Sequence, residues 1–307
     1  MKDILNSLNE KQRQAVAITD GPLLIIAGAG SGKTRTLTHK VAYLIREKNI
    51  YPNNILAVTF TNKAAGEMKE RILKLLDGSS SLPMVGTFHS ISAKILRKEI
   101  DKLGYGRSFN IIDDHDQLSL MKKIFTRLEI SKDQFNPRSF LEAISKAKNN
   151  LIDSQQFSLG VGGYFEEVVS RAYGEYQKEL KKNNSLDFDD LIMFVVKIFQ
   201  KYPETLEKYQ NQFRYVLVDE YQDTNHSQYL LVNLIAKKHR NICVVGDDWQ
   251  SIYGWRQADI NNILDFEKDY PEANVISLEQ NYRSSQVILD AAYGVISQNV
   301  FRKDKNL

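Results

Sequence analysis

The stretch that decides the fold is Leu23–Thr34, with the sequence LLIIAGAGSGKT. An apolar run comes first, a glycine-rich turn follows, and a helical pattern continues from Arg35 to Lys48. A strand, a glycine-rich turn and a Lys-Thr pair at the start of a helix are together typical of a phosphate-binding loop. Backbone N–H groups of such a loop surround phosphate oxygens, and the helix N-terminus adds partial positive charge at the same place. The segment therefore predicts a site for a triphosphate.

Each residue of this loop has an expected role. Lys33 would reach the β- and γ-phosphates, and the Thr34 hydroxyl would bind Mg²⁺. The strict pattern has glycine where Ala27 stands, but the glycines that follow supply backbone freedom nearby. An ordinary glycine-rich turn before a helix is the alternative, and the Gly-Lys-Thr order with its flanking elements favours the phosphate site. The residues expected to bind the nucleotide here are Gly28, Ala29, Gly30, Ser31, Gly32, Lys33 and Thr34.

Composition describes a globular protein with room for two domains. The chain has 307 residues, of which 42% are hydrophobic and 26% are charged. No apolar stretch is long enough to span a bilayer, and the first residues lack the apolar centre of a signal peptide. The single cysteine, Cys243, has no internal disulfide partner, so we expect a reducing, cytoplasmic setting. The net charge of +3 mildly favours nucleic acid as a binding partner.

The order of elements predicts an α/β fold with a parallel sheet. Apolar runs that alternate with helical patterns indicate strands covered by helices on both faces. One such helix spans about Asn62 to Leu76, with Thr61 placed to cap it. The expected strands are Leu23–Ile26, Ile55–Phe60, Met84–Phe88, Tyr215–Val218, Ile242–Val245 and Asn274–Leu278.

The middle of the chain differs from both ends. From about Asp114 to Asn184 it shows helical patterns, many lysines and few strand candidates, with a glycine-rich interruption near Gly162. The simplest architecture is therefore one α/β domain split by an all-helical insertion.

An acidic pair follows the fourth expected strand. Asp219 and Glu220 come directly after Val218, and a carboxylate at the carboxyl end of a parallel strand is well placed to bind Mg²⁺ beside the phosphate loop. Asp219 would hold the metal, and Glu220 would orient and deprotonate the attacking water. A solvated strand end is the alternative for the pair taken alone, but the phosphate loop upstream favours the metal site.

A second segment follows the next strand. Gln250 lies one turn beyond the strand end, where it could contact a γ-phosphate. Tyr253, Trp255 and Arg256 place two aromatic rings and a cation on one short loop, and such residues suit base stacking and phosphate contact. Packing of both rings into the core is the alternative.

Several motifs in one order resemble the UvrD/PcrA/Rep group of superfamily 1 DNA helicases, and the resemblance covers nearly the whole chain. It implies a RecA-like motor domain that uses ATP and Mg²⁺. Besides the phosphate loop and the Gln250 segment, the motifs are Leu8–Arg13, Val58–Ala65, Gly86–Ser90, Leu186–Leu191, Asp219–Thr224 and Leu278–Ser284.

The resemblance also implies roles for single residues. Gln12 would read the adenine edge, and Arg35 and Tyr282 would flank the base. Arg283 would contact the γ-phosphate, where charge develops during transfer. Gln250 would link the γ-phosphate to the DNA-binding loop. Lys33, Asp219, Glu220, Gln250 and Arg283 then form the expected catalytic set, with Thr34 and Asp219 on the metal.

Single-stranded DNA is the partner that the resemblance implies, with duplex junctions beside it. Stacking suits translocation because every base offers a π-face and sequence need not be read. Alternatives remain for some candidates: Phe60 as a buried strand end, His89 as a structural histidine, and Arg283 as a surface ion-pair partner. For the acidic residues Asp187, Asp189 and Asp190, the favoured interpretation is the acidic N-terminus of a helix. The expected DNA contacts are Phe60, Asn62, His89, Tyr253, Trp255 and Arg256.

The resemblance sets expected domain boundaries. A motor domain would comprise residues 1–113 and 185–278, a helical insertion 114–184, and the start of a second motor domain 279–307. Since the second motor domain is expected to supply half of the ATP cleft, we expect this chain alone to bind nucleotide weakly and hydrolyse it slowly. Two local departures stand out, because the family usually has an acid where Trp249 stands and a glycine where Gln257 stands.

Three functions remain open at this point. The first is an ATP-driven translocase and DNA helicase of which this chain is the N-terminal portion. The second is the motor part of a helicase–nuclease subunit, which a downstream nuclease domain would reveal. The third is a module that binds ATP or single-stranded DNA without moving, which would follow if Leu307 were a natural terminus.

Overall fold

The computed structural model describes residues 4–78, 81–250 and 257–296, which fall into two units. The first unit comprises Met1–Phe88, Leu206–Thr224 and Val232–Leu307, and the second comprises His89–Thr205 and Asn225–Leu231. Among the helices that the structure describes, none combines the length and the apolar character that a bilayer crossing requires.

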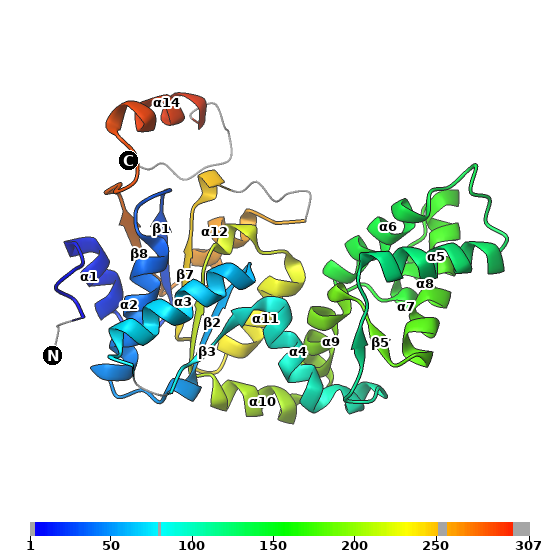
Figure 1. Ribbon diagram of the computed structural model, residues 1–307, viewed down its shortest axis with the longest axis horizontal. Coiled ribbons are helices and arrows are strands. Elements are labelled where there is room, and N and C mark those ends of the chain that lie inside the picture. Colours follow the sequence, from blue (N-terminus) through cyan, green and yellow to red (C-terminus); the bar gives the residue numbers. More distant parts are fainter. Residues whose placement is uncertain (1–3, 79–80, 251–256, 297–307) are drawn as a thin grey trace. The chain divides into compact units, whose positions relative to one another are not determined.

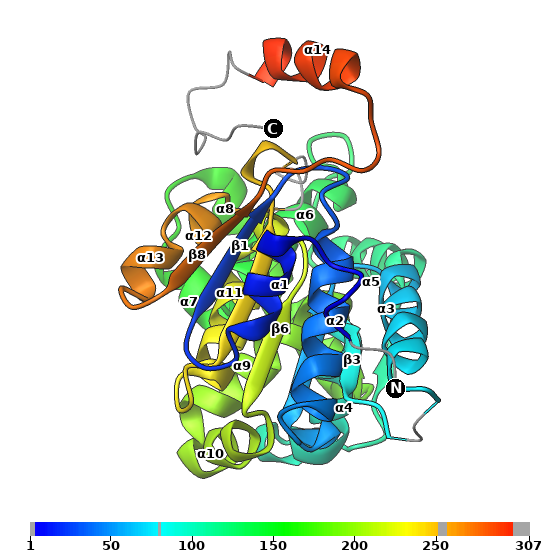
Figure 2. The same ribbon diagram turned by 90° about the vertical axis from the view of Figure 1, so that its left-hand side faces the viewer.

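A six-stranded sheet forms the centre of the first unit, and all of its neighbouring strands run parallel. The strand order is β3-β2-β6-β7-β1-β8. Every residue of β1, β2 and β7 is buried, because helices cover both faces of the sheet (Figure 2). The predicted α/β fold with a parallel sheet is confirmed. The strands are β1 (Leu23–Ala27), β2 (Ile55–Thr59), β3 (Met84–Thr87), β6 (Tyr215–Val218), β7 (Ile242–Gly246) and β8 (Asn274–Leu278).

Helices α2 and α3 cover one face of this sheet, and α12 and α13 lie on the other side (Figure 2). Thr61 caps α3 as predicted, since its side chain accepts a hydrogen bond from the Ala64 backbone N–H. The helices of this unit are α1 (Glu10–Ala17), α2 (Lys33–Arg46), α3 (Asn62–Leu75), α12 (Asn261–Leu264), α13 (Phe266–Asp269) and α14 (Gln286–Ile296). Two more helices, α10 (Pro203–Gln212) and α11 (His226–Ala236), extend across the boundary between the units.

Ala27 closes β1 and does not belong to the turn. Its side chain is fully buried in the core, and it pairs with Leu278 of β8. A small side chain fits this core position, which explains why the loop tolerates alanine where the strict pattern has glycine.

The second unit is helical apart from a two-stranded parallel sheet (Figure 1). Its core lies between α5, α6 and α8, and includes Phe125, Phe140 and Tyr173. Residues 114–184, which the structure describes throughout, hold only helices among their regular elements, in line with the helical pattern of the sequence. The elements are α4 (Phe88–Glu99), β4 (Asn110–Ile111), α5 (Asp114–Arg127), α6 (Pro137–Asn149), α7 (Ser154–Leu159), α8 (Tyr164–Lys182), β5 (Ser185–Leu186) and α9 (Phe188–Lys201).

The acids at the start of α9 are more than a solvated helix start. Asp187 caps the helix by accepting a hydrogen bond from the Asp190 backbone N–H, 2.9 Å away. Lys148 of α6 is fully buried, with its Nζ 2.6 Å from Asp187 Oδ2 and 2.8 Å from Asp190 Oδ1. Charged groups inside a protein need such partners, because burial without them is very costly. The cluster therefore ties α9 to α6.

Candidate nucleotide site

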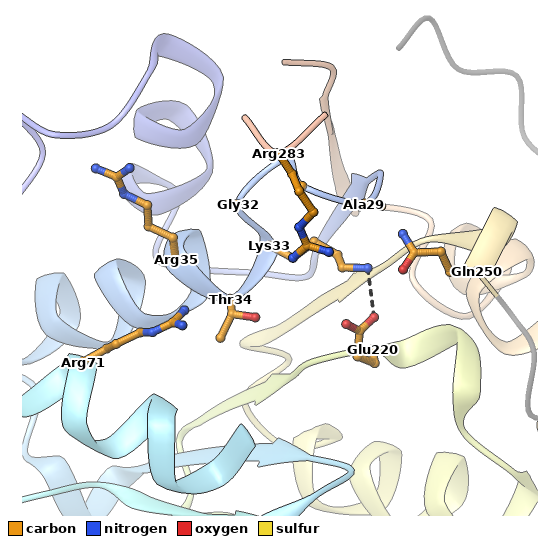
Figure 3. Close-up of a pocket in the computed structure, with 10 residues that line it drawn as sticks. Ala29, Gly32, Lys33, Thr34, Arg35, Arg71, Glu220, Gln250 and Arg283 are labelled. Atoms are coloured by element: carbon orange, nitrogen blue, oxygen red, sulfur yellow. Dashed lines mark ion pairs between the residues drawn. The ribbon is translucent and has the colours of Figure 1, made fainter. Parts of the chain in front are cut away.

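The carboxyl ends of β1, β6 and β7 meet at one edge of the sheet of the first unit. The loop after β1 holds Lys33, the turn after β6 holds Glu220, and the turn after β7 holds Gln250. Between them is a cavity of about 180 Å³ (Figure 3). Ligands of open α/β sheets bind at this edge. The cavity is lined by Ala29, Gly30, Gly32, Lys33, Thr34, Arg35, Arg71, Glu220, Gln250 and Arg283.

The glycine-rich turn delivers an uncapped helix N-terminus to the cavity. Gly32 precedes α2 in a left-handed conformation with φ +88°, and no side chain caps the helix there. A Cβ at Gly32 would lie 2.7 Å from Gln12 Nε2, so both conformation and space require glycine. The loop is closed by Ser31, whose hydroxyl donates to the Gly28 carbonyl at 2.7 Å. The first N–H groups of α2 are therefore available to an anion.

Gln12 fixes this loop from α1. Its side chain is buried, its Nε2 donates to the Ser31 carbonyl at 2.9 Å, and its Oε1 accepts from the Asn9 backbone N–H at 3.2 Å. The Asn9 side chain in turn caps α1 by accepting from the Gln12 backbone N–H. The structure thus places Gln12 against the phosphate loop, and the adenine contact expected for it remains a prediction.

Arg35 and Tyr282 both contact the segment before α1. Arg35 donates through Nη2 to the Ser7 carbonyl at 2.5 Å, and Figure 3 shows its guanidinium pointing away from Lys33. The Tyr282 hydroxyl accepts from Asn9 Nδ2 and donates to Gln280 Oε1, both at 2.8 Å. Their expected place on either side of a base stays a prediction.

Lys33 and Glu220 form an ion pair in the site. Lys33 Nζ lies 2.9 Å from Glu220 Oε2, and the two side chains point toward each other in Figure 3. Glu220 itself has φ +51°, a left-handed conformation that is uncommon outside glycine and recurs at functional sites. The pair leaves Lys33 at the cavity wall, where an incoming phosphate could replace Glu220 as its partner.

Asp219 has the surroundings of a metal ligand. It is buried, and its Oδ2 accepts a hydrogen bond from the Thr34 hydroxyl at 3.2 Å. Burial and the neighbouring Glu220 raise the pKa of Asp219 to about 6, although Lys33 and Thr34 oppose the shift. A bound cation would oppose this shift by favouring the charged carboxylate, and two hard oxygen donors suit Mg²⁺. Thr34 and Asp219 therefore fit the metal expected from the sequence.

The segment after β8 is attached to the phosphate loop. Asn281 Nδ2 donates to the Ala29 carbonyl at 2.5 Å, and the Tyr282 backbone N–H donates to the Gly30 carbonyl at 2.9 Å. Asn281 Oδ1 also accepts from the Arg283 backbone N–H at 2.8 Å. These contacts place Arg283 at the cavity. The anchoring role of Asn281 was not predicted, although it lies inside a motif recognised in the sequence.

Arg71 is the second residue that sequence reasoning missed. It comes from the C-terminal half of α3, and Figure 3 shows its guanidinium directed toward Thr34. Its Nη2 lies 3.3 Å from Glu67 Oε2 on the same helix. A single arginine on an amphipathic helix carries no local signal of a binding role, so only the fold reveals its position.

The structure describes contacts or backbone conformation at the two positions, Trp249 and Gln257, where the sequence departs from the family. The ring of Trp249 lies 5.8 Å from the ring of Tyr293 on α14. Gln257 adopts φ +62°, the left-handed region that favours glycine. Glycine, which is usual in the family at this position, adopts such a conformation without strain. Gln257 is therefore strained here.

The expected DNA contacts are distributed over both units. Phe60 is half-buried and packs edge-on against Phe88 with ring centroids 5.4 Å apart, and Asn62 opens α3 in an exposed position. His89 belongs to the second unit, where its ring lies 5.7 Å from that of Phe188. The remaining candidates, Tyr253, Trp255 and Arg256, lie outside the described residues.

Comparison with known proteins gives one consistent result. A sequence model of the UvrD/REP helicase N-terminal domain matches residues 8–271. The chain is 56% identical over 304 residues to the ATP-dependent DNA helicase PcrA of Bacillus subtilis. This match covers 99% of the chain and 41% of that protein. It is 53% identical over 307 residues to the PcrA helicase of Staphylococcus aureus, covering 100% of this chain and 42% of that protein. The chain therefore spans about two fifths of the length of these relatives.

Proposed function

The chain belongs to the UvrD/REP helicase family, and from this we propose that its first unit is the N-terminal ATP-binding part of an ATP-dependent DNA translocase and helicase. ATP and Mg²⁺ are the proposed ligands of the cavity. Single-stranded DNA, with duplex junctions, is the proposed nucleic acid along which the protein moves. The cytoplasm is the proposed compartment. The relatives carry the name ATP-dependent DNA helicase, and the site chemistry supports the same assignment.

One observation carries the ATP-binding proposal. One cavity is lined by an uncapped helix N-terminus, a lysine paired with a carboxylate, and a hydroxyl that donates to a buried carboxylate behind it. The first two bind phosphate oxygens, and the third binds a divalent cation.

Each residue of the site has its own proposed role in ATP hydrolysis. The α2 N-terminus and Lys33 bind the phosphates, while Thr34 and Asp219 hold the metal, which neutralises phosphate charge when bound. When Lys33 turns to a phosphate oxygen, Glu220 loses its ion-pair partner and can accept the proton of the attacking water. Arg283 and Gln250 face the same cavity, where they would stabilise the charge of the transferred group.

A second motor domain is the proposed partner for turnover. The described half of the site exposes its cavity, and charge stabilisation from one side alone leaves hydrolysis slow. We keep the division into a motor domain (1–113 and 185–278), a helical insertion (114–184) and the start of a second motor domain (279–307) as part of this proposal. The motor of a helicase–nuclease and a non-translocating module remain the alternatives.

DNA binding is proposed for Phe60, Asn62, His89, Tyr253, Trp255 and Arg256. The Trp255→Ala variant is expected to weaken binding of a fluorescent single-stranded oligonucleotide by about 1–3 kcal/mol in anisotropy titrations, as one lost base stack requires. Unchanged anisotropy curves would instead favour packing of Trp255 in the core.

Nucleotide binding is tested by the Lys33→Ala variant in titrations with a fluorescent ATP analogue and Mg²⁺. Loss of a charge-assisted hydrogen bond should weaken the affinity on the order of tenfold to a hundredfold. Lys11→Ala is the matched control, because Lys11 is an exposed lysine on α1 and should leave the affinity unchanged. Equal affinities for both variants would refute the assignment of the phosphate site.

A further inference from the structure

Gln222 is a buried glutamine that joins the ends of β6 and β7. It lies in the short helix η3 (Tyr221–Asp223) directly after the acidic pair, with 1% of its surface exposed. Its Nε2 donates to Glu220 Oε2 at 3.0 Å and to Asp223 Oδ2 at 3.2 Å. Its Oε1 accepts from the Asp247 backbone N–H at 3.0 Å. One side-chain amide thus contacts a carboxylate of the site on one side and the β7 turn on the other.

The orientation of this amide is set by its partners. Only the oxygen can accept from the Asp247 N–H, so the NH₂ group necessarily faces the carboxylates. Rotating the amide would place two donors against each other and leave Glu220 facing an oxygen. The Gln222 side chain therefore acts as a fixed spacer with a donor end and an acceptor end.

Gly246 brings the β7 backbone against this spacer. A Cβ at Gly246 would lie 2.6 Å from Gln222 Oε1 and 2.6 Å from Ile263 Cδ1. Any larger residue at position 246 would have to displace these two side chains, so glycine keeps the approach close. The end of β7 is thus packed directly on the amide, and a displacement of one would be transmitted to the other.

The same chain of contacts reaches Gln250. Asp247 Oδ2 accepts from Gln250 Nε2, and Asp247 Oδ1 accepts from the Trp249 backbone N–H at 3.1 Å. Glu220 and the Gln250 turn are therefore joined through Gln222 and Asp247 by hydrogen bonds. This turn leads into the segment that carries the proposed DNA contacts Tyr253 and Trp255.

Lys33 and Gln222 share one oxygen of Glu220. Both Lys33 Nζ and Gln222 Nε2 contact Oε2, at 2.9 and 3.0 Å. If Lys33 turns to a phosphate oxygen, as proposed above, Gln222 is the donor that stays on Glu220 Oε2. We propose that Gln222 is a positioning residue that holds Glu220 in place for water activation and couples it to the Gln250 turn. This inference rests on the proposed function, which makes Glu220 the base.

The test compares Gln222→Glu with wild type in the longest natural chain that contains these residues. The variant keeps the size and the acceptor but places an oxygen where Glu220 needs a donor. Loss of a hydrogen bond to a charged group predicts that kcat of DNA-stimulated ATP hydrolysis falls on the order of tenfold to a hundredfold. The Kd for a fluorescent ATP analogue should stay within about twofold, since Gln222 lies outside the phosphate contacts. Gln14→Glu, the same change at an exposed glutamine of α1, is the control and should alter neither quantity.

Two outcomes would overturn this inference alone, and a third would overturn the proposed function together with it. An unchanged kcat shows that Gln222 does not position the base, and a kcat and affinity that fall together show a structural role. A wild-type chain that neither binds nor hydrolyses ATP overturns both proposals at once.

A second measurement does not depend on folding of a Gln222 variant. In ¹⁵N–¹H spectra of the Glu220→Gln variant, the side-chain NH₂ resonances of Gln222 should shift, because their charged acceptor is gone. Those of the exposed Gln14 should not shift. If the Gln222 resonances stay in place, the contact that carries the inference does not exist in solution.

Discussion

Replacing Lys148 by methionine should destabilise the helical unit far more than a surface substitution does. Lys148 is fully buried, and its ammonium group is the cation that neutralises Asp187 and Asp190. Burial alone would lower the pKa of Lys148, yet the two carboxylates raise it above its ordinary value. Methionine keeps the apolar stem of the side chain and removes only the charge, so the two acids would be left buried without a cation.

The magnitude follows from the geometry of the cluster. Both ion pairs are shorter than 3 Å in the absence of solvent, and the Tyr176 hydroxyl adds a hydrogen bond to Asp187 Oδ2 at 3.1 Å. Removing one partner of such a buried pair costs about 3–5 kcal/mol, because the remaining charge is uncompensated. The triple variant Lys148→Met, Asp187→Asn, Asp190→Asn should recover most of this loss, since it has no buried charge and asparagine still caps a helix.

Urea unfolding followed by far-ultraviolet circular dichroism measures these free energies. Lys146→Met is the matched control, because Lys146 lies on the same helix α6 but is exposed, and it should change the free energy of unfolding by less than about 0.5 kcal/mol. A Lys148→Met variant as mild as the control would contradict a role for the buried charge. A triple variant as unstable as the single one would contradict it too, since the loss would then come from packing and not from charge.

Three further predictions concern the site itself. Because the pKa of Asp219 is raised to about 6, its contribution to the stability of the nucleotide-free protein is full below the pKa of the unfolded state and is lost as pH rises through about 6. Mg²⁺ needs the charged carboxylate, so Mg²⁺-dependent binding of a fluorescent ATP analogue should weaken below about pH 6. Asp219→Asn should reduce that pH dependence, while Asp223, whose pKa is also raised to about 6, still titrates in this range. Arg71→Ala should weaken nucleotide binding by about 0.5–1.5 kcal/mol in the same titration, and an unchanged Kd would remove Arg71 from the site. Gln257→Gly should raise the free energy of unfolding by up to about 1 kcal/mol through relief of its positive φ, whereas a lowered melting temperature would show that the Gln257 side chain matters more than the strain.

Much of the fold could be predicted because its signals are local. An apolar run such as Tyr215–Val218 lies between helical patterns, and the structure places a strand at those residues. The glycine-rich turn and the acidic pair could be linked because the carboxyl ends of parallel strands meet at one edge. Even the alanine at position 27 is explained once it is seen as the buried last residue of β1.

What could not be predicted depends on contacts between distant residues. Lys148 looks like an ordinary lysine of a basic helix, and its partners Asp187 and Asp190 lie about forty residues away in sequence. Arg71 reaches the cavity only because α3 packs beside the phosphate loop, and no local pattern encodes that position. The sequence gives no sign of a role for Gln222 inside its acidic motif. Its contact with the β7 turn is seen only in the folded structure.

The central proposal is that the cavity at Lys33 and Glu220 belongs to a DNA-dependent ATPase. It is tested most directly by measuring ATP hydrolysis with increasing single-stranded DNA in the longest natural chain that contains these 307 residues, with Glu220→Gln as the inactive control. We expect the rate to rise with DNA concentration to saturation, and we expect the Glu220→Gln variant to lose this activity. A rate that is the same with and without DNA, or that survives the loss of the Glu220 carboxylate, would contradict it.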